Sequence, residues 1–177
     1  MARVEAVLFA ASEPVGRDIL ARVVGRDCAL DLLIEDISAE LAGRPYEIAR
    51  VAGGWQFRTR PHHAVAIRVA RGEDDAVREF TQNEALVLTI IAYMQPVTRG
   101  AISRLTGREI SRDLIARLHR QDLIARGPRS PEPGAPYTYV TTPGFLVQFG
   151  LETLRDLPDL EALEDAGLLK PVGEIDL

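Results

Sequence analysis

The sequence contains one cysteine, Cys28, and one lysine among its 177 residues. A single cysteine excludes an intramolecular disulfide framework and fits a protein that folds in a reducing compartment. The longest nearly unbroken apolar run, 85–94, is about half as long as the roughly 20 residues that a membrane-spanning helix needs. The apolar start of the chain is interrupted by Glu5, which argues against a secretory signal. We therefore expect a cytoplasmic protein.

Motifs of catalysis and of nucleotide binding are also missing. No glycine-rich phosphate loop occurs, and no serine lies in a nucleophile-elbow pattern. His62 and His63 are adjacent and so point in different directions, while His119 has no metal-ligating neighbour in the sequence. The acidic stretch 73–75 lacks the spacing of a calcium loop and reads as a solvated linker. We predict no enzyme activity, no catalytic residue, no metal site and no cofactor.

A repeated pattern organises the rest of the chain. "SEPVGRDILARVVGRD" at 12–27 and "QPVTRGAISRLTGRE" at 95–109 share a Pro-Val pair, two arginines and a Gly-Arg pair at the same spacing. The composition, 46% hydrophobic and 27% charged, is typical of globular proteins. A chain of this length can form one large domain or two small ones. The repeat favours two related modules.

The first copy predicts three helices followed by a hairpin. Val4, Val7, Leu8 and Ala11 form one apolar stripe of a helix. A short second helix follows Gly16 and ends at Gly25, which we expect to be left-handed, and a third covers 30–41. Two β-type runs, 46–52 and 55–60, are joined by a Gly-Gly turn, and a fourth helix covers 62–70.

The second copy repeats this order. Thr81 and Glu84 form a capping box at the start of a helix that is apolar on nearly every side, so we expect it to pack against more than its own module. Thr98 and Ser111 cap the next two helices, and Gly107 ends the first of these. Strands at 123–127 and 137–142, a helix at 144–149 and an acidic, leucine-containing tail complete the chain.

These elements predict an α+β, mainly helical fold of two tandem winged helix-turn-helix domains. We assign 1–72 to an N-terminal winged-helix domain, 73–79 to a linker, 80–150 to a C-terminal winged-helix domain and 151–177 to the tail. The leucines of the tail need an apolar surface, which can belong to this chain or to a partner.

Helix-turn-helix units usually place their third helix in the DNA major groove, so a winged-helix DNA-binding transcriptional regulator is an alternative function. The third helix of the first copy opposes this, because its outer face is acidic: Asp31, Glu35, Asp36 and Glu40. The second copy is basic around the same helix: Arg108, Arg112, Arg117, His119 and Arg120, with Arg126 and Arg129 near the hairpin. Weak non-specific DNA contact and a solvated basic face both stay open there.

Five stretches, taken together and in order, resemble the segregation and condensation protein B family. They are "VEAVLFAASEPV", "VAGGWQFRTRP", "LTIIAYMQPVTRGAISRLTG", "TTPGFLVQFGL" and "LRDLPDL". The resemblance implies a homodimer formed through the N-terminal domain. It also implies binding to a kleisin subunit of the segregation and condensation protein A type, and through it to the ATPase of a bacterial SMC complex at the nucleoid. No catalytic residue is implied.

Two segments depart from the family pattern. The family usually has Arg-Gly-Val where this chain has Thr106, Gly107 and Arg108. The last strand also differs, with Gly-Ala-Pro at 134–136 and Tyr-Val-Thr-Thr at 139–142. We therefore expect the partner contacts of the second hairpin and third helix to be particular to this chain.

Candidate binding residues are mainly aromatic side chains and those around the repeated Pro-Val pair. For partner binding they are Tyr93, Gln95, Pro96, Arg99, Tyr137, Tyr139, Phe145 and Phe149, and for the dimer interface they are Trp55 and Phe57. Trp55 and Phe57 share one strand face, as do Tyr137 and Tyr139. Burial in the core is the alternative role for each of these aromatic pairs.

Overall fold

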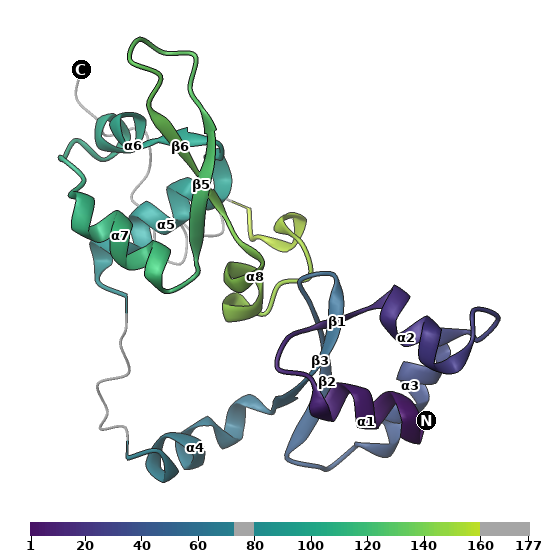
Figure 1. Cartoon of the computed structure of the whole chain (residues 1–177). Coiled ribbons are helices and arrows are strands. Elements are labelled where there is room, and N and C mark those ends of the chain that lie inside the picture. The colour runs from purple at the N-terminus through teal and green to yellow at the C-terminus, as the bar shows by residue number, and fades with distance from the viewer. Residues whose placement is uncertain (73–79, 160–177) are drawn as a thin grey trace. The chain divides into compact units, whose positions relative to one another are not determined.

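The computed structural model describes residues 1–72 and 80–159, which form two compact units (Figure 1). The first unit contains 1–72 together with 149–153, and the second contains 80–148 together with 154–159. The sequence-derived linker, 73–79, and most of the acidic tail, 160–177, lie outside the described residues. Among the described helices, none is both long and apolar enough to cross a membrane.

The first unit combines helices with a three-stranded antiparallel sheet in the order β1-β3-β2. Its elements are α1 (Ala2–Ala10), β1 (Val15–Gly16), α2 (Arg17–Val24), α3 (Leu30–Glu40), β2 (Tyr46–Val51), β3 (Gly54–Thr59), the 3-10 helix η1 (Pro61–His63) and α4 (Ala64–Ala70). The predicted helices and hairpin are present. The two-residue strand β1 was not predicted, because it exists only through its pairing with β3.

Apolar side chains of α1, α2 and α3 and one face of the sheet form the core of this unit. Val4, Leu8, Leu20 and Ile37 are at most 1% exposed. Val4 and Leu8 lie on the apolar stripe predicted for the first helix, so the helical periodicity identified the buried face of α1. Gly16 is the N-cap of α2 as expected, whereas Gly25 has φ +96° and ψ 147°, a positive φ outside the left-handed helical region.

Gly54 is required where the hairpin passes the start of α2. It pairs with Gly16 across β1 and β3. A Cβ atom at Gly54 would lie 2.9 Å from the backbone carbon and oxygen of Val15, closer than real Cβ contacts allow. The glycine therefore permits the close approach of the two strands.

The second unit has the same order of elements, with a sheet ordered β4-β6-β5. Its elements are α5 (Gln82–Met94), β4 (Val97–Thr98), α6 (Arg99–Thr106), α7 (Arg112–Arg120), β5 (Ile124–Arg129), β6 (Tyr137–Thr141), α8 (Pro143–Phe149) and the 3-10 helix η2 (Leu154–Asp156). The side chains of Thr81, Thr98 and Ser111 accept backbone hydrogen bonds as helix caps, as predicted.

The Glu84 carboxylate joins two helices of the second unit. It accepts hydrogen bonds from the backbone N–H and the hydroxyl of Thr81, at 2.9 and 2.8 Å. It also pairs with Nε of Arg117 on α7 at 2.5 Å, and Glu84 is only 3% exposed. These three contacts compensate the burial of a negative charge, and the Glu84 backbone N–H completes the capping box by donating to the Thr81 hydroxyl.

Helix α5 buries one side within its own unit. Val87, Leu88 and Ile91 are at most 3% exposed, whereas Met94 at the end of the helix is 53% exposed. Packing of α5 against a surface beyond its own unit stays a prediction.

Residues 149–153 pair with the turn of the first hairpin. The backbone N–H of Ala52 donates to the carbonyl of Leu151 at 2.9 Å, and that of Gly53 donates to Glu152 at 3.1 Å. Arg50 pairs with the Glu152 carboxylate at 2.9 Å. Sequence analysis divided this segment between the end of a helix and the acidic tail. The pairing could not be predicted, because backbone hydrogen bonds to a distant turn leave no pattern in the sequence.

Gly54→Ala should destabilise the first unit by about 1–3 kcal/mol, since the new methyl group overlaps the Val15 backbone. Urea denaturation followed by circular dichroism measures the change. Gly100→Ala is the matched control: its Cβ would lie 3.8 Å from the Arg104 guanidinium, so this helical change should stabilise by about 0.4–1 kcal/mol. Equal effects of the two substitutions would contradict the steric role of Gly54.

Glu84→Ala should lower the free energy of unfolding by about 1–3 kcal/mol, because it removes the capping box and leaves Thr81 and Arg117 without their acceptor. Glu109→Ala removes an exposed carboxylate 3.9 Å from Arg99 and should change stability by less than about 1 kcal/mol. Chemical denaturation of both variants compares them, and similar losses would argue against the role of Glu84.

Candidate functional site

The aromatic residues of the first hairpin are largely part of its own unit. Trp55 is 5% exposed and belongs to the core, and the guanidinium groups of Arg17 and Arg50 lie 5.7 and 5.4 Å from its ring. Phe57 is half-buried and meets Tyr46 edge-on at 5.7 Å. The structure thus gives Trp55 a role in the core, because the helices and two arginines enclose its ring.

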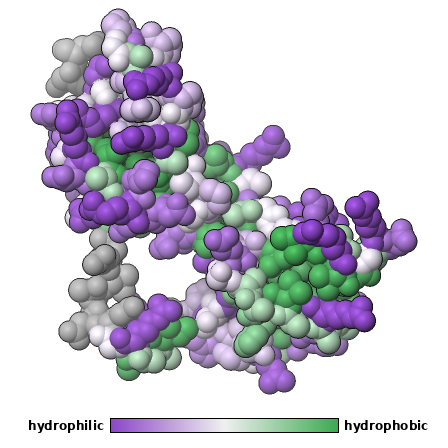
Figure 2. Space-filling model, in the orientation of Figure 1, coloured by the Kyte–Doolittle hydropathy of each residue, from purple (hydrophilic) through white to green (hydrophobic). Residues whose placement is uncertain are grey.

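Other apolar residues of the first unit are uncovered in this chain. Phe9 on α1 is 86% exposed, and Val65 and Val69 on α4 are 60% and 74% exposed. None of the seven residues of α4 is buried, although only Arg68 among them is polar. Figure 2 shows hydrophobic surface on the first unit, including its α4 segment. The sequence signal was available in "AVAIRVA", which has no polar face.

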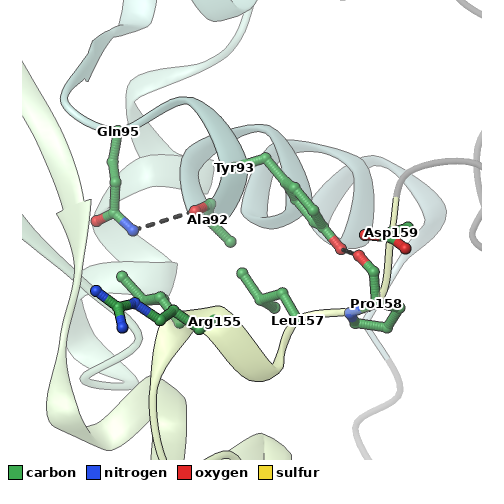
Figure 3. Close-up of a pocket in the computed structure, with 8 residues that line it drawn as sticks. Ala92, Tyr93, Gln95, Arg155, Leu157, Pro158 and Asp159 are labelled. Carbon is green, nitrogen blue, oxygen red and sulfur yellow. Dashed lines mark hydrogen bonds between the residues drawn. The ribbon is translucent and has the colours of Figure 1, made fainter.

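The end of α5 carries the residues around the second Pro-Val pair. The Tyr93 hydroxyl donates to the carbonyl oxygen of Pro158 (Figure 3). The Gln95 amide donates to the carbonyl of Ala92 at 3.1 Å and accepts from the backbone N–H of Thr141 at 2.7 Å. Gln95 therefore holds β6 against the end of α5.

Pro96 and Arg99 follow directly. Pro96 is exposed, after a cis peptide bond. The Arg99 guanidinium donates to the carbonyl of Ile110 at 2.7 Å and thereby secures the turn before α7. The polar groups of Gln95 and Arg99 are thus already in use within the unit.

A hollow of about 790 Å³ lies between the end of α5 and the segment 154–159 (Figure 3). Its lining combines apolar side chains with polar and charged ones: Ala92, Tyr93, Gln95, Leu154, Arg155, Leu157, Pro158 and Asp159. Sequence analysis identified Tyr93 and Gln95 but missed the leucines. The repeat-like "LRDLPDL" was visible in the sequence, but its position beside α5 was not.

Partial burial raises the pKa of the Tyr93 phenol, and the negative charge of Asp159 raises it further. Both effects disfavour the phenolate, because one removes water and the other adds like charge. The neutral hydroxyl that donates to Pro158 is therefore the form that persists to high pH.

The second hairpin presents an aromatic ring covered by arginines. Tyr137 is 42% exposed, and the guanidinium carbons of Arg126 and Arg129 lie 5.0 and 4.1 Å from the centre of its ring. Arg129 also donates to the Tyr137 hydroxyl at 3.0 Å. Tyr139 is half-buried and pairs with Val97 and Arg126 in the sheet.

The two phenylalanine candidates differ in accessibility. Phe145 is 4% exposed and lies in the core of the second unit, whereas Phe149 is 45% exposed and belongs to the first unit. The structure therefore does not gather all the partner-binding candidates at one place. Tyr93 and Gln95 share the hollow, while Tyr137 marks the hairpin.

Residues suited to metal binding are not clustered in the described part of the chain. No group of three or more His, Cys, Asp or Glu side chains in residues 1–72 and 80–159 could hold a metal ion. The His62 and His63 rings lie beside one another, with their centres 4.0 Å apart and their planes tilted by 48°. The exposed apolar, aromatic and arginine side chains named above are of the kinds that are enriched where proteins bind macromolecules.

Comparison with known proteins decides the family. A sequence model described as "Segregation and condensation complex subunit ScpB" matches residues 2–160, which span both units. The chain belongs to this family. ScpB proteins are subunits of a complex that acts in chromosome segregation and condensation, so the same role in that complex applies to this chain.

Segregation and condensation protein B of Desulforamulus reducens is 38% identical over 162 residues, covering 89% of this chain and 87% of that protein. The protein of the same name from Syntrophotalea carbinolica is 37% identical, covering 89% of this chain and 80% of that one. The crystal structure of ScpB from Mycobacterium tuberculosis is 25% identical over 85% of this chain and 94% of that chain, with a TM-score of 0.39. The family resemblance proposed from the sequence is confirmed by the sequence relatives.

The Tyr93 phenol should ionise above its ordinary pKa of 10.0. Its contribution to stability is fully present below pH 10.0 and is lost as the pH rises through the raised pKa, because the unfolded chain releases the proton first. NMR of labelled tyrosine rings measures the midpoint. Asp159→Asn should lower this midpoint, because it removes the negative charge beside the phenol. Asp113→Asn, on α7, is the control and should leave the midpoint unchanged. An unchanged midpoint in Asp159→Asn would contradict the charge effect.

Proposed function

We propose that this chain is a non-enzymatic subunit of an SMC–kleisin complex and acts as a homodimer that binds the kleisin. Through the kleisin it would join the SMC ATPase at the nucleoid in the cytoplasm. The main support for this proposal is the match of the ScpB family model to residues 2–160, because this range includes both units of the chain. The residues described above offer surfaces for proteins rather than a gathered catalytic group, which supports a docking role.

Each unit is proposed to be a winged helix-turn-helix domain. The support is the common element order of helix, short strand, two helices and a two-stranded hairpin that pairs with the short strand. The N-terminal domain would hold the dimer and the C-terminal domain the kleisin. In this view the hairpins are the wings, and the turn of the first wing is occupied by residues 149–153 of the same chain.

The kleisin site is proposed at the hollow beside α5. A floor that includes Ala92, Leu154 and Leu157, with Tyr93 and charged groups at its edge, suits an apolar segment with polar flanks. Gln95 and Arg99 would position the site through their internal hydrogen bonds instead of contacting the partner. Tyr137 would extend the contact onto the wing.

The dimer interface is proposed on the exposed apolar residues of the first unit. A seven-residue helix is too short to be stable in water by itself, and α4 buries none of its residues in this chain. A second copy would cover Val65 and Val69, and by two-fold symmetry the first copy would do the same for its partner. Phe57, which is half-buried, stays a candidate for the dimer interface.

Co-purification with the kleisin encoded in the same genome, followed by native mass spectrometry, tests the proposal. We expect a stable complex with two copies of this chain. Failure to form any complex with the kleisin under conditions where both proteins are folded would overturn the proposed function.

Leu154→Glu should weaken kleisin binding by about tenfold or more, since a charge would enter the apolar part of the hollow. Leu105→Glu on α6 is the matched control, because Leu105 is 37% exposed and Leu154 is 39% exposed. Isothermal titration calorimetry with the kleisin measures both affinities. Equal weakening would place the site elsewhere.

Val69→Glu should shift the homodimer to monomer, because it places a charge on the apolar α4. Leu32→Glu on α3 serves as the control, as Leu32 is 60% exposed and Val69 is 74% exposed. Sedimentation velocity at a series of concentrations gives the monomer fraction. A Val69→Glu protein that dimerises as well as the control would rule out α4 as the interface.

A further inference from the structure

We propose that the second unit binds the phosphate backbone of double-stranded DNA, without sequence preference, through a basic surface on α7, the turn before it and the β5–β6 hairpin. This basic surface consists of Arg108, Arg112, Arg120, Arg126 and Arg129. None of these arginines lines the hollow. Arg126 and Arg129 touch the Tyr137 ring, to which the proposed kleisin contact extends, so the test below uses arginines of α7.

All five arginines are exposed and have no carboxylate partner among the described residues, and three of them lie on or next to α7. Arg112 and Arg120 lie at the two ends of α7, and Arg108 lies in the turn that precedes it. The rise of an α-helix places Arg112 and Arg120 about 12 Å apart along the axis. Arg112 and Arg120 are both exposed, whereas Ile115 and Leu118 of the same helix are buried.

The orientation of this helix is fixed by a different arginine. Arg117 is paired with the buried carboxylate of Glu84 at 2.5 Å. Arg104 on α6 is likewise paired, with Glu132 at 3.5 Å. Arg104 and Arg117 therefore pair with carboxylates of their own unit, whereas the arginines of the basic surface do not.

The hairpin adds two arginines that are already oriented. Arg126 and Arg129 lie over the Tyr137 ring, and Arg129 donates to the Ala135 carbonyl at 2.8 Å and to the Tyr137 hydroxyl. A guanidinium has five N–H donors, so Arg129 keeps donors for a phosphate. Stacking on the ring lowers the entropy lost on binding, since the side chain is held before the ligand arrives.

Acidic residues in the same segment limit the strength of binding. Residues 108–129 contain six arginines but also Glu109, Asp113 and Asp122, which leaves a net charge of +3. This balance suits weak, salt-sensitive contact with phosphates and not tight recognition of base edges.

The corresponding helix of the first unit has the opposite sign. On α3 the carboxylates of Asp31, Glu35, Asp36 and Glu40 are all exposed, and the helix has no basic residue. Phosphate groups would be repelled there, so only one of the two related units carries the basic surface. The same scaffold thus has one face suited to DNA and one that rejects it.

Fluorescence anisotropy of the full chain with a labelled duplex of random sequence tests the proposal. The two variants compared are Arg112→Glu with Arg120→Glu, and Arg22→Glu with Arg26→Glu. The control pair occupies exposed positions of the first unit and makes the same change in net charge. Circular dichroism checks the fold of each variant, and kleisin binding of each is measured in parallel.

We expect measurable binding at about 50 mM salt that weakens as salt rises, with a slope of about 0.9 per phosphate contact in a log–log plot. The α7 variant should bind DNA at least about tenfold more weakly and with a slope lower by about 1–2, whereas the control should change less than about twofold. Kleisin binding should be retained in both.

The inference would be wrong if the wild-type chain did not bind DNA at low salt, or if the two double variants lost equal affinity for DNA. It would also be wrong if the α7 variant lost kleisin binding while its DNA binding was unchanged, because the basic surface would then be a site for an acidic protein segment. Tight binding to one particular DNA sequence would also contradict it and would favour a transcriptional regulator.

Discussion

The second unit depends on one buried carboxylate. Glu84 closes the capping box of α5 with Thr81 and at the same time pairs with Arg117 on α7. A carboxylate that is 3% exposed must be compensated by hydrogen bonds and a cation, so α5 and α7 are held in one relative orientation. That orientation decides which arginines of α7 face solvent. Arg117 of α7 is thus engaged within the unit, whereas Arg112 and Arg120 remain available for ligands.

The repeat in the sequence conserves a scaffold but not a surface. In both units a Pro-Val pair leads into a two-residue strand, which pairs with the hairpin before a short helix begins. Backbone pairing makes this arrangement, with Gly16 opposite Gly54 in the first unit and Thr98 opposite Thr138 in the second, and it imposes few demands on outward-facing side chains. The outer face of α3 carries carboxylates and that of α7 carries arginines, while exposed apolar residues, among them Phe9, Val65 and Val69, are found on several elements of the first unit. One fold can therefore present three different kinds of surface.

Segments that follow the second hairpin complete both units. Residues 149–153 pair with the turn of the first hairpin, and residues 154–159 form one side of the hollow in the second unit. The order of the chain thus does not correspond to a simple succession of two domains. Because Tyr93 donates to Pro158, the aromatic candidate found in the sequence acts together with residues from a segment that sequence reasoning treated as a tail. The hollow exists only once these two segments lie together.

Local interactions determined what the sequence alone could establish. The caps at Thr81, Thr98 and Ser111, the apolar stripes of α1 and α3 and the turn of the first hairpin each involve residues within a few positions of one another, so their patterns are visible in the sequence. Tertiary structure alone decided that Trp55 lies in the core, that Val65 and Val69 are uncovered and that Leu154 and Leu157 lie beside Tyr93. Hydrophobic burial has no direction, and an apolar residue carries no mark of the distant surface that will cover it.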